Sequence, residues 1–454
     1  MNPEALAELG ASVLSTDADV TAAYAHDESR LTGRSTPVAV LAPASTAEVA
    51  ACLRVATREG WHVIPRGAGS GLSGAANGAG EFVVLSTHRL DSISSIDPVE
   101  RIAVVQPGVV TGDLRAAVAA QGLFYPPDPG SVAFSTIGGN VATNAGGMCC
   151  VKYGVTGDFV LGLEVVLADG RVMRTGRRTA KGVAGYDLTH LFVGSEGTLG
   201  VVTEITVRLL PAPRPPLTLV ATFRSLTDAG QAVAAIAATG SPVSMLEIMD
   251  RTTLEAVDRL ARMGFEPGTA AMLLVQSDEP DSAGVLAEVE KLCAGAGAVD
   301  VAVGDDPEEG AQLLEARRLA LPALERLGDW LLDDVCVPRG RIVELIELIE
   351  GVAADEGLTI GVFGHAGDGN MHPTVIFDDA DPHSREAALR AFDRITEHAL
   401  ALGGTITGEH GVGRLKRSWL ARELDETAMA VHRAVRSALD PDGLLNPGNL
   451  FDPA

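Results

Sequence analysis

The chain has 454 residues and a formal net charge of −25, with 46% hydrophobic and 21% charged residues. A chain of this length exceeds what one hydrophobic core usually supports, so two or three packed domains are expected. The acidic balance excludes a general affinity for nucleic acid or anionic lipid, since both need a basic face.

The N-terminal segment and the cysteines both indicate a cytoplasmic protein. Glu4 and Glu8 precede the first arginine, Arg30, without the basic and apolar regions of a secretory signal. The five cysteines are odd in number and lack C-x-x-C spacing, which disfavours disulfides and iron–sulfur clusters. No apolar run is long enough to span a membrane. We therefore expect a cytoplasmic protein and leave open its peripheral docking on the inner membrane.

Strand and helix patterns alternate through the first half of the chain, after a polar helical segment at residues 1–33. A capping-box pattern at Ser45 begins the first long helix. We expect helices at 45–59 and 111–121 and strands at 61–65, 82–86, 102–106, 161–167 and 200–209. Between Asp128 and Gly147, Gly, Ser, Thr and Asn dominate, and we expect irregular backbone wrapped around a ligand.

The clearest linker is Pro211–Pro216, because four prolines in six residues cannot continue a helix or a sheet. We therefore expect an N-terminal segment at 1–33, a domain at 34–213 and a second domain at 214–454. In the second domain, the patterns predict strands at 217–223 and 271–276 and helices at 225–238, 282–294, 307–327, 339–356, 384–402 and 425–439. This alternation predicts an α+β domain.

Pro65–Gly74 interleaves four glycines with Arg66, Ser70 and Ser73. Backbone N–H groups without neighbouring Cβ atoms can close around an anion such as a pyrophosphate, although a glycine-rich turn without a ligand has the same composition. No apolar helical period follows the loop, as it would after the G-x-G-x-x-G of a Rossmann fold. The pattern therefore disfavours NAD.

Two strands, Thr359–His365 and Met371–Phe377, flank Asp368-Gly369, a strong hairpin signal. With these two residues at the centre of the turn, His365 pairs with His372, and their Cβ atoms lie about 5 Å apart on one face. Two such histidines can bind one metal ion, and Glu409 or His410 can supply a third ligand while the other faces the reacting atom. The ligand types suit Zn²⁺, Mn²⁺ or Fe²⁺.

Taken together, several motifs resemble one family. They are Pro65–Gly71, Ser135–Gly147, Lys152-Tyr153-Gly154, Gly185–Leu188 and Gly194–Gly200, followed by Gly364–His372 and Gly408–Gly411. Their order resembles the FAD-linked enzymes of the vanillyl-alcohol-oxidase (PCMH-type) superfamily, in the branch of D-lactate dehydrogenases and glycolate oxidase flavin subunits. The resemblance implies an α+β fold: a PCMH-type two-lobed FAD-binding domain, then an α+β (ferredoxin-like) substrate domain with a C-terminal helical cap.

The resemblance implies FAD bound by the first loop, the glycine-rich segment and the later Glu-Gly motif. The implied residues are Pro65, Arg66, Gly67, Ala68, Gly69, Ser70, Gly71, Leu72, Ser135, Thr136, Gly138, Gly139, Asn140, Thr143, Asn144, Gly146, Gly147, Tyr153, Glu196, Gly197, Gly200 and Val202. Covalent members attach FAD through a histidine after the first glycines, where this chain has Ser70. We therefore expect non-covalent FAD.

The same resemblance implies His365, His372 and Glu409 as metal ligands and His410 as the base. A planar guanidinium suits a substrate carboxylate, and we assign Arg317 to it, with Arg318 as the alternative. Relatives that favour longer dicarboxylates carry a lysine before the Asp334-Val335-Cys336-Val337-Pro338 strand. This chain has Leu332 and Asp333 there.

These residues favour a dehydrogenase that oxidises D-lactate or another short D-2-hydroxy acid to the 2-oxo acid, with hydride transfer to the flavin. Glycolate and 2-hydroxyglutarate are the alternative substrates, and a non-catalytic flavin-binding subunit is the alternative class. The acceptor is expected to be a quinone, a cytochrome or an electron-transfer flavoprotein rather than NAD. Whether the chain works alone, as a homodimer or in a larger oxidase stays open.

Overall fold

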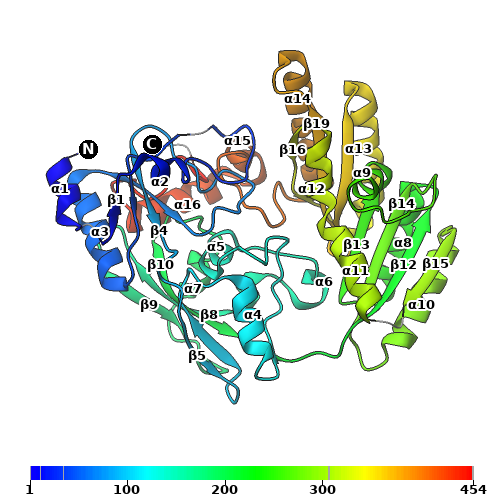
Figure 1. Ribbon diagram of the computed structural model, residues 1–454, viewed down its shortest axis with the longest axis horizontal. Helices are drawn as coiled ribbons and strands as arrows, with labels where there is room; N and C mark the ends of the chain where they lie inside the picture. Colours follow the sequence, from blue (N-terminus) through cyan, green and yellow to red (C-terminus); the bar gives the residue numbers. More distant parts are fainter. Residues whose placement is uncertain (1, 11, 34, 305–306, 452–454) are drawn as a thin grey trace. The chain divides into compact units, whose positions relative to one another are not determined.

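The computed structural model describes residues 2–10, 12–33, 35–304 and 307–451. The chain forms two compact units (Figure 1). Unit 1 comprises Met1–Gly146, Val155–Ala212 and Glu409–Ala454, and unit 2 comprises Gly147–Gly154 and Pro213–Gly408. The boundary after Ala212 falls inside the expected proline linker. The expected domain limits at residues 1, 34 and 454 lie outside the described residues.

A four-stranded sheet in unit 1 has the order β1-β2-β4-β3, formed by Leu14–Ser15, Ala39–Leu41, Phe82–Ser86 and His62–Arg66. β2 and β3 both pair parallel with β4, and helix α3 (Thr46–Glu59) connects them. The side chain of Ser45 accepts the N–H of Glu48 and begins this helix, as the capping pattern predicts. Short helix α1 (Pro3–Glu8) precedes β1, and α2 (Ala18–Ala22) lies between β1 and β2 in the chain.

A second, antiparallel sheet in unit 1 has the order β5-β6-β10-β8-β9, formed by Ile93–Asp97, Ile102–Val105, Val201–Arg208, Val160–Val166 and Val172–Gly176. Helices α5 (Ile137–Thr143) and α7 (Thr189–Phe192) contact this sheet. Helix α4 (Thr111–Ala119) contacts β7 (Leu123–Phe124), which pairs with β11 (Leu210–Pro211). Helix α5 contradicts the expectation of irregular backbone throughout 128–147. Thr136 caps its first turn by accepting the N–H of Gly139, and Asn144 ends it at a φ of 53°.

The C-terminal segment, with α15 (Arg417–Glu423) and α16 (Glu426–Leu439), belongs to unit 1. The Val63 N–H donates to the Leu444 carbonyl at 2.9 Å, and the Asn446 N–H donates to the Val63 carbonyl at 2.8 Å. These bonds attach the end of the chain to strand β3. The compact units therefore differ from the expected limits of 214–454, because the last helices pack with the N-terminal unit.

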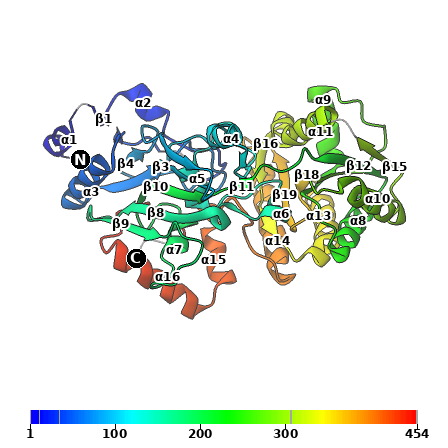
Figure 2. The same ribbon diagram turned by 90° about the horizontal axis from the view of Figure 1, so that it is seen from below.

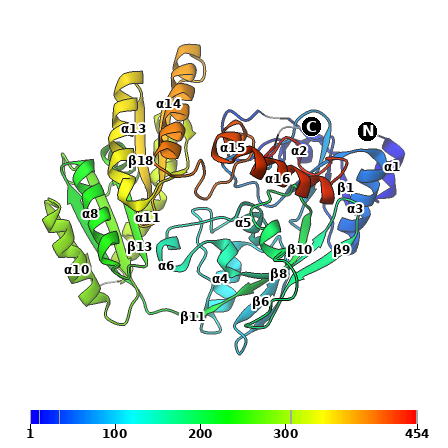
Figure 3. The same cartoon turned by 180° about the vertical axis from the view of Figure 1, so that it is seen from behind.

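Unit 2 is built on one eight-stranded antiparallel sheet (Figures 2 and 3). Its order is β15-β12-β14-β13-β18-β19-β16, with β17 also paired to β19. The strands, in that order, are Asp300–Gly304, Leu217–Phe223, Ala271–Ser277, Met245–Asp250, Thr359–His365, Asn370–Phe377 and Asp329–Leu332, and β17 is Val335–Cys336.

Helices cover both faces of this sheet. One face carries α8 (Leu226–Thr239), α10 (Ser282–Gly295), α13 (Ile342–Glu356) and α14 (Pro382–Ala401). The other carries α9 (Arg251–Ala261), α11 (Pro307–Arg318) and α12 (Ala320–Leu324) (Figure 2). Every residue of the central strands β13 and β14 is buried, so a charged side chain in these strands must find its partners inside the protein.

A short piece of the expected FAD-binding region, Gly147–Gly154, belongs to unit 2. Its helix α6 (Cys150–Tyr153) lies against β13, and Met148 packs with Met245 and Leu274. The Lys152 ammonium also pairs with Glu279 at 2.7 Å. The sequence motifs place this segment in the FAD-binding domain, whereas its contacts place it in unit 2.

All five cysteines are free. Among the described residues, no helix is both long and apolar enough to cross a bilayer.

Candidate active site

The first glycine loop and the second glycine-rich segment lie together in unit 1. A Cβ on Gly67 would lie 2.4 Å from the Thr136 hydroxyl oxygen, so only glycine allows this approach. The Arg66 guanidinium is buried beneath the loop, where it donates to the His26 carbonyl at 2.9 Å and lies over the Tyr24 ring. Its Nη1 has no hydrogen-bond partner among the described residues, which suits a site that accepts an anion.

The third expected FAD segment joins the same region through helix α5. The Gly194 N–H donates to the Val141 carbonyl, and the Glu196 N–H donates to the Ala142 carbonyl at 2.8 Å. The structure thus brings together the expected residues of Pro65–Leu72, Ser135–Asn144 and Glu196–Gly200, all within unit 1. The expected residues Gly147 and Tyr153 belong to unit 2 instead.

The histidine hairpin forms between β18 and β19, but its predicted register is wrong by two residues. His365 pairs with Asn370, and Phe363 pairs with His372. The turn is longer than the expected two residues because the N–H groups of Asp368 and Gly369 both donate to the His365 carbonyl. A shift of two keeps side chains on the same face, and the two imidazole centroids lie 5.1 Å apart. One ligand atom of each histidine lies within 4.8 Å of the other.

Glu247, on β13, contacts both His365 and Arg317. Its Oε1 lies 2.7 Å from His365 Nδ1, and its Oε2 forms an ion pair with Arg317 Nη2 at 2.7 Å. The side chain of Glu247 is 1% exposed, and that of Arg317 is 6% exposed. Because a carboxylate accepts, Nδ1 of His365 carries the proton, and Nε2 becomes the lone-pair nitrogen that can ligate a metal.

Arg317 lies over the Phe363 ring, 4.8 Å from its centroid. Its Nε is buried and has no hydrogen-bond partner among the described residues. The guanidinium therefore retains donor capacity for a carboxylate despite its ion pair with Glu247. The alternative, Arg318, is more exposed and lies 3.5 Å from Glu315 on its own helix.

Asp334 lies near the second histidine, His372. Its Oδ1 lies 3.7 Å from His372 Nδ1 and accepts a hydrogen bond from Asn370 Nδ2 at 2.8 Å. Its Oδ2 accepts the Thr407 hydroxyl at 2.7 Å and the Gly408 N–H at 3.0 Å. These bonds tie the segment that leads into the Glu-His pair to the hairpin of unit 2.

Glu409 and His410 follow directly after Gly408. His410 Nε2 lies 3.7 Å from Glu409 Oε1, and both side chains are largely buried. The backbone of His410 is also fixed, since its carbonyl accepts the Ser73 hydroxyl at 3.0 Å. A carboxylate and an imidazole thus stand next to each other, one peptide bond beyond the residue that Asp334 holds.

Sequence reasoning missed Glu247, Asn370 and the function of Asp334. One signal for Glu247 was present, because a single glutamate within Met245-Leu246-Glu247-Ile248-Met249 is unusual for a strand buried on both faces. The link from Glu247 to His365 joins strands more than a hundred residues apart in sequence, and no local pattern contains it.

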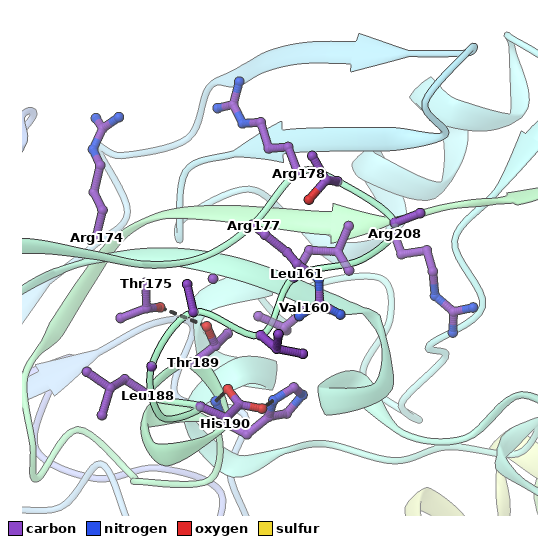
Figure 4. A pocket seen from close by; sticks show the side chains of 18 of the residues that line it. Val160, Leu161, Arg174, Thr175, Arg177, Arg178, Leu188, Thr189, His190 and Arg208 are labelled. Carbon is purple, nitrogen blue, oxygen red and sulfur yellow. Dashed lines mark hydrogen bonds and ion pairs between the residues drawn. The ribbon is translucent and has the colours of Figure 1, made fainter.

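A separate hollow of about 920 Å³ lies in unit 1 at one end of the five-stranded sheet (Figure 4). Val160, Leu161 and Thr175 contribute to its lining, and so do several arginines. Arg174 is held by Glu164 at 2.7 Å, and Arg208 lies over the Phe159 ring. Among the described residues, the lining includes none of the expected site residues.

Comparison with known proteins agrees with this architecture. The chain matches the family model "FAD linked oxidases, C-terminal domain" over residues 212–450 and the model "FAD binding domain" over residues 37–176. Among solved structures, p-cresol methylhydroxylase with substrate bound has a TM-score of 0.79, covering 99% of this chain and 96% of that one. At 18% identity this likeness shows the fold alone. The α+β fold with a PCMH-type FAD domain is confirmed.

Two curated relatives narrow the class. The chain is 43% identical over 421 residues to the glycolate oxidase subunit GlcD of Bacillus subtilis (strain 168), covering 92% of this chain and 90% of that protein. It is 34% identical over 439 residues to a D-lactate dehydrogenase of Anaerostipes hadrus, covering 94% and 92%. The fold and the family matches define an FAD-linked oxidoreductase. Within that class, the chain belongs to the FAD-linked oxidase family, in the branch that holds these two relatives.

Proposed function

We propose that this chain oxidises a short D-2-hydroxy acid to its 2-oxo acid, with D-lactate as the favoured substrate. The observation that carries the proposal is the contact of buried Glu247 with both Arg317 and His365. This one carboxylate orients a cation suited to a substrate carboxylate and an imidazole suited to a metal. The relatives described as acting on glycolate and D-lactate support the same substrate class.

The donor set of unit 2 fits a divalent metal ion. His365 and His372 present two imidazoles within ligand distance of each other, and each has a carboxylate beside its Nδ1. The contact of Glu247 with Nδ1 fixes the tautomer of His365, as carboxylates do for metal-binding histidines. The family resemblance implies Glu409 as the third ligand, and a set of two nitrogens and one oxygen suits Zn²⁺, Mn²⁺ or Fe²⁺.

Two residues of this chain act on the substrate in the proposed reaction. Arg317 holds the substrate carboxylate and so orients C2 and its hydroxyl. His410 removes the hydroxyl proton, the general-base step. When bound, FAD would supply the hydride acceptor, and a metal ion held by His365 and His372 would supply positive charge that makes the substrate hydroxyl more acidic.

Flavin reduction tests this function. The holoenzyme is mixed anaerobically with D-lactate, L-lactate, glycolate, D-2-hydroxyglutarate and L-2-hydroxyglutarate, and the flavin absorbance is followed. We expect the fastest reduction with D-lactate and slow reduction with both 2-hydroxyglutarate isomers. Lack of reduction by every substrate would overturn the proposal and favour a non-catalytic flavin-binding subunit.

Glycolate is the second candidate substrate, because the relative with 43% identity is described as a glycolate oxidase subunit. The same panel separates the two by the ratio of their reduction rate constants. The electron acceptor for the FAD would be a quinone, a cytochrome or an electron-transfer flavoprotein, and parallel assays with each acceptor distinguish these three.

Non-covalent FAD is part of the proposal, since Ser70 offers no nitrogen for covalent attachment. We expect a yellow protein that releases intact FAD into the filtrate on denaturation. Flavin that stays with the precipitated protein would contradict this.

A further inference from the structure

Glu196 is a buried glutamate of unit 1 with an unusual backbone. It is 4% exposed and has a φ of 52°, a left-handed conformation that residues other than glycine rarely adopt. Its N–H is bonded to Ala142, and its carbonyl accepts the Asn446 side chain at 2.6 Å. The surrounding structure therefore fixes the direction in which its carboxylate points.

The carboxylate of Glu196 accepts hydrogen bonds from the loop after His410. The Val412 N–H donates to Oε1 at 2.7 Å, and the Gly413 N–H donates to Oε2 at 2.9 Å and Oε1 at 3.1 Å. A Cβ on Gly411, whose φ is +88°, would lie 2.7 Å from Oε1. The loop thus wraps closely around the carboxylate, and a side chain at 411 would push it away.

Ser73 fixes the same loop from another direction. Its hydroxyl donates to the His410 carbonyl, and its own carbonyl accepts the N–H groups of Arg414 and Leu415 at 3.0 Å each. Ser73 and Glu196 together therefore hold the backbone from His410 to Leu415.

We propose that Glu196 is a positioning residue that sets the orientation of His410 by holding the backbone of Val412 and Gly413. The proposal rests on the proposed function, because it takes His410 to be the base. It differs from the expectation that Glu196 serves FAD, since the carboxylate is occupied by backbone N–H groups of this chain. A displacement of a catalytic group by about 1 Å can slow a reaction roughly hundredfold, so the stiffness of this loop affects the rate.

The charge of the buried Glu196 carboxylate is a second reason to expect that it holds the loop after His410. Within the described residues it has no ion-pair partner, and only backbone N–H groups offset its charge. Burial raises its pKa to about 7, and the bonds from Gly413 and Val412 oppose that rise. A buried carboxylate needs hydrogen-bond donors, and the N–H groups of Val412 and Gly413 supply them to Glu196.

The test compares Glu196→Gln with His410→Asn and with the double variant, using anaerobic flavin reduction of the FAD-loaded protein by D-lactate. We expect Glu196→Gln to lower the limiting reduction rate constant by roughly 10-fold to 100-fold, with substrate affinity changed by less than about threefold. The double variant should reduce no more slowly than His410→Asn alone, because the effect of Glu196 passes through His410. Glu204→Gln, a half-buried glutamate in the same unit, is the matched control and should keep the parent rate.

Several outcomes would overturn the proposal. Losses that multiply in the double variant would mean that Glu196 acts independently of His410. Loss of FAD from Glu196→Gln at an unchanged rate for the loaded fraction would make it a cofactor residue. If Glu196→Gln fails to fold, Ser73→Ala replaces it, with the same expected split between rate and affinity. If His410→Asn itself reduces at the parent rate, the proposed base fails, and a slow Glu196→Gln then shows a different function for the loop.

Discussion

Two buried glutamates, one in each unit, are stabilised in different ways. Glu247 in unit 2 contacts a guanidinium and an imidazole, whereas Glu196 in unit 1 accepts only backbone N–H groups. Glu247 therefore orients side chains that can reach a ligand, and Glu196 orients a stretch of backbone. Burial alone therefore does not assign a function to a carboxylate, because its hydrogen-bond and ion-pair partners determine what it positions.

The largest expected effect is the loss of bound metal when both His365 and His372 are replaced. We expect the parent protein to hold one divalent metal per chain and His365→Ala/His372→Ala to hold almost none, because two of three ligands are lost. FAD should remain bound, since its expected residues lie mainly in unit 1. Elemental analysis with a flavin absorbance measurement checks both, and unchanged metal content would refute the assignment.

Glu247→Ala removes the buried carboxylate of unit 2 from its contacts with Arg317 and His365. It leaves buried Arg317 without its ion-pair partner, which should lower the free energy of unfolding by about 3–5 kcal/mol. Glu255→Ala, at an exposed glutamate on α9, is the control and should cost less than about 1 kcal/mol. Urea denaturation measures both. Equal small losses would mean that the Glu247 contacts contribute little to stability.

His410→Asn tests the residue that the unit 1 carboxylate is proposed to position. Asparagine is similar in size but cannot accept the hydroxyl proton, so flavin reduction by D-lactate should slow by about a hundredfold or more. FAD and metal content should not change. Stopped-flow reduction at saturating substrate measures the effect, and a near-parent rate would transfer the base function to Glu409 or to another group.

A smaller effect should appear in the pH dependence of stability. Because the pKa of Glu196 is raised from 4.5 to about 7, the folded protein binds a proton more tightly than the unfolded chain between these values. The stabilisation is complete below about pH 4.5 and is lost as the pH rises through about 7. Relative to Glu196→Gln, the parent should therefore lose about 1–3 kcal/mol between pH 4.5 and 8. Urea denaturation at a series of pH values measures this. A difference in unfolding free energy between the parent and Glu196→Gln that stays constant with pH would contradict the prediction.

The sequence predicted local structure well and long-range pairing poorly. The strands at 82–86 and 217–223 have the expected bounds, because a run of apolar residues between turn signals determines both. The hairpin was found, but its register was two residues off because an Asp-Gly pair also fits longer turns. Helix α5 was missed since its glycines disfavour a helix, and the Thr136 cap compensates only in part.

For the candidate site, the sequence supplied the histidines but not what surrounds them. His365 and His372 stand in one hairpin, so their proximity follows from local pairing. Glu247 comes from another strand of the sheet and Asp334 from the connection between β16 and β17, and only the strand order brings them beside the imidazoles. The order of strands in a sheet depends on contacts across the whole domain, which a single sequence does not reveal.

The attachment of the last segment to β3 has a consequence for biosynthesis. Val63 is bonded to Leu444 and Asn446, so the first sheet lacks this partner until the ribosome has added these two residues. Unit 2 is complete at Gly408 and can fold earlier, whereas unit 1 has to wait with part of its core uncovered. Leu445 belongs to that core beside Val63 and Leu85. A chain that stops short at its C-terminus would therefore expose the N-terminal unit to aggregation and proteolysis.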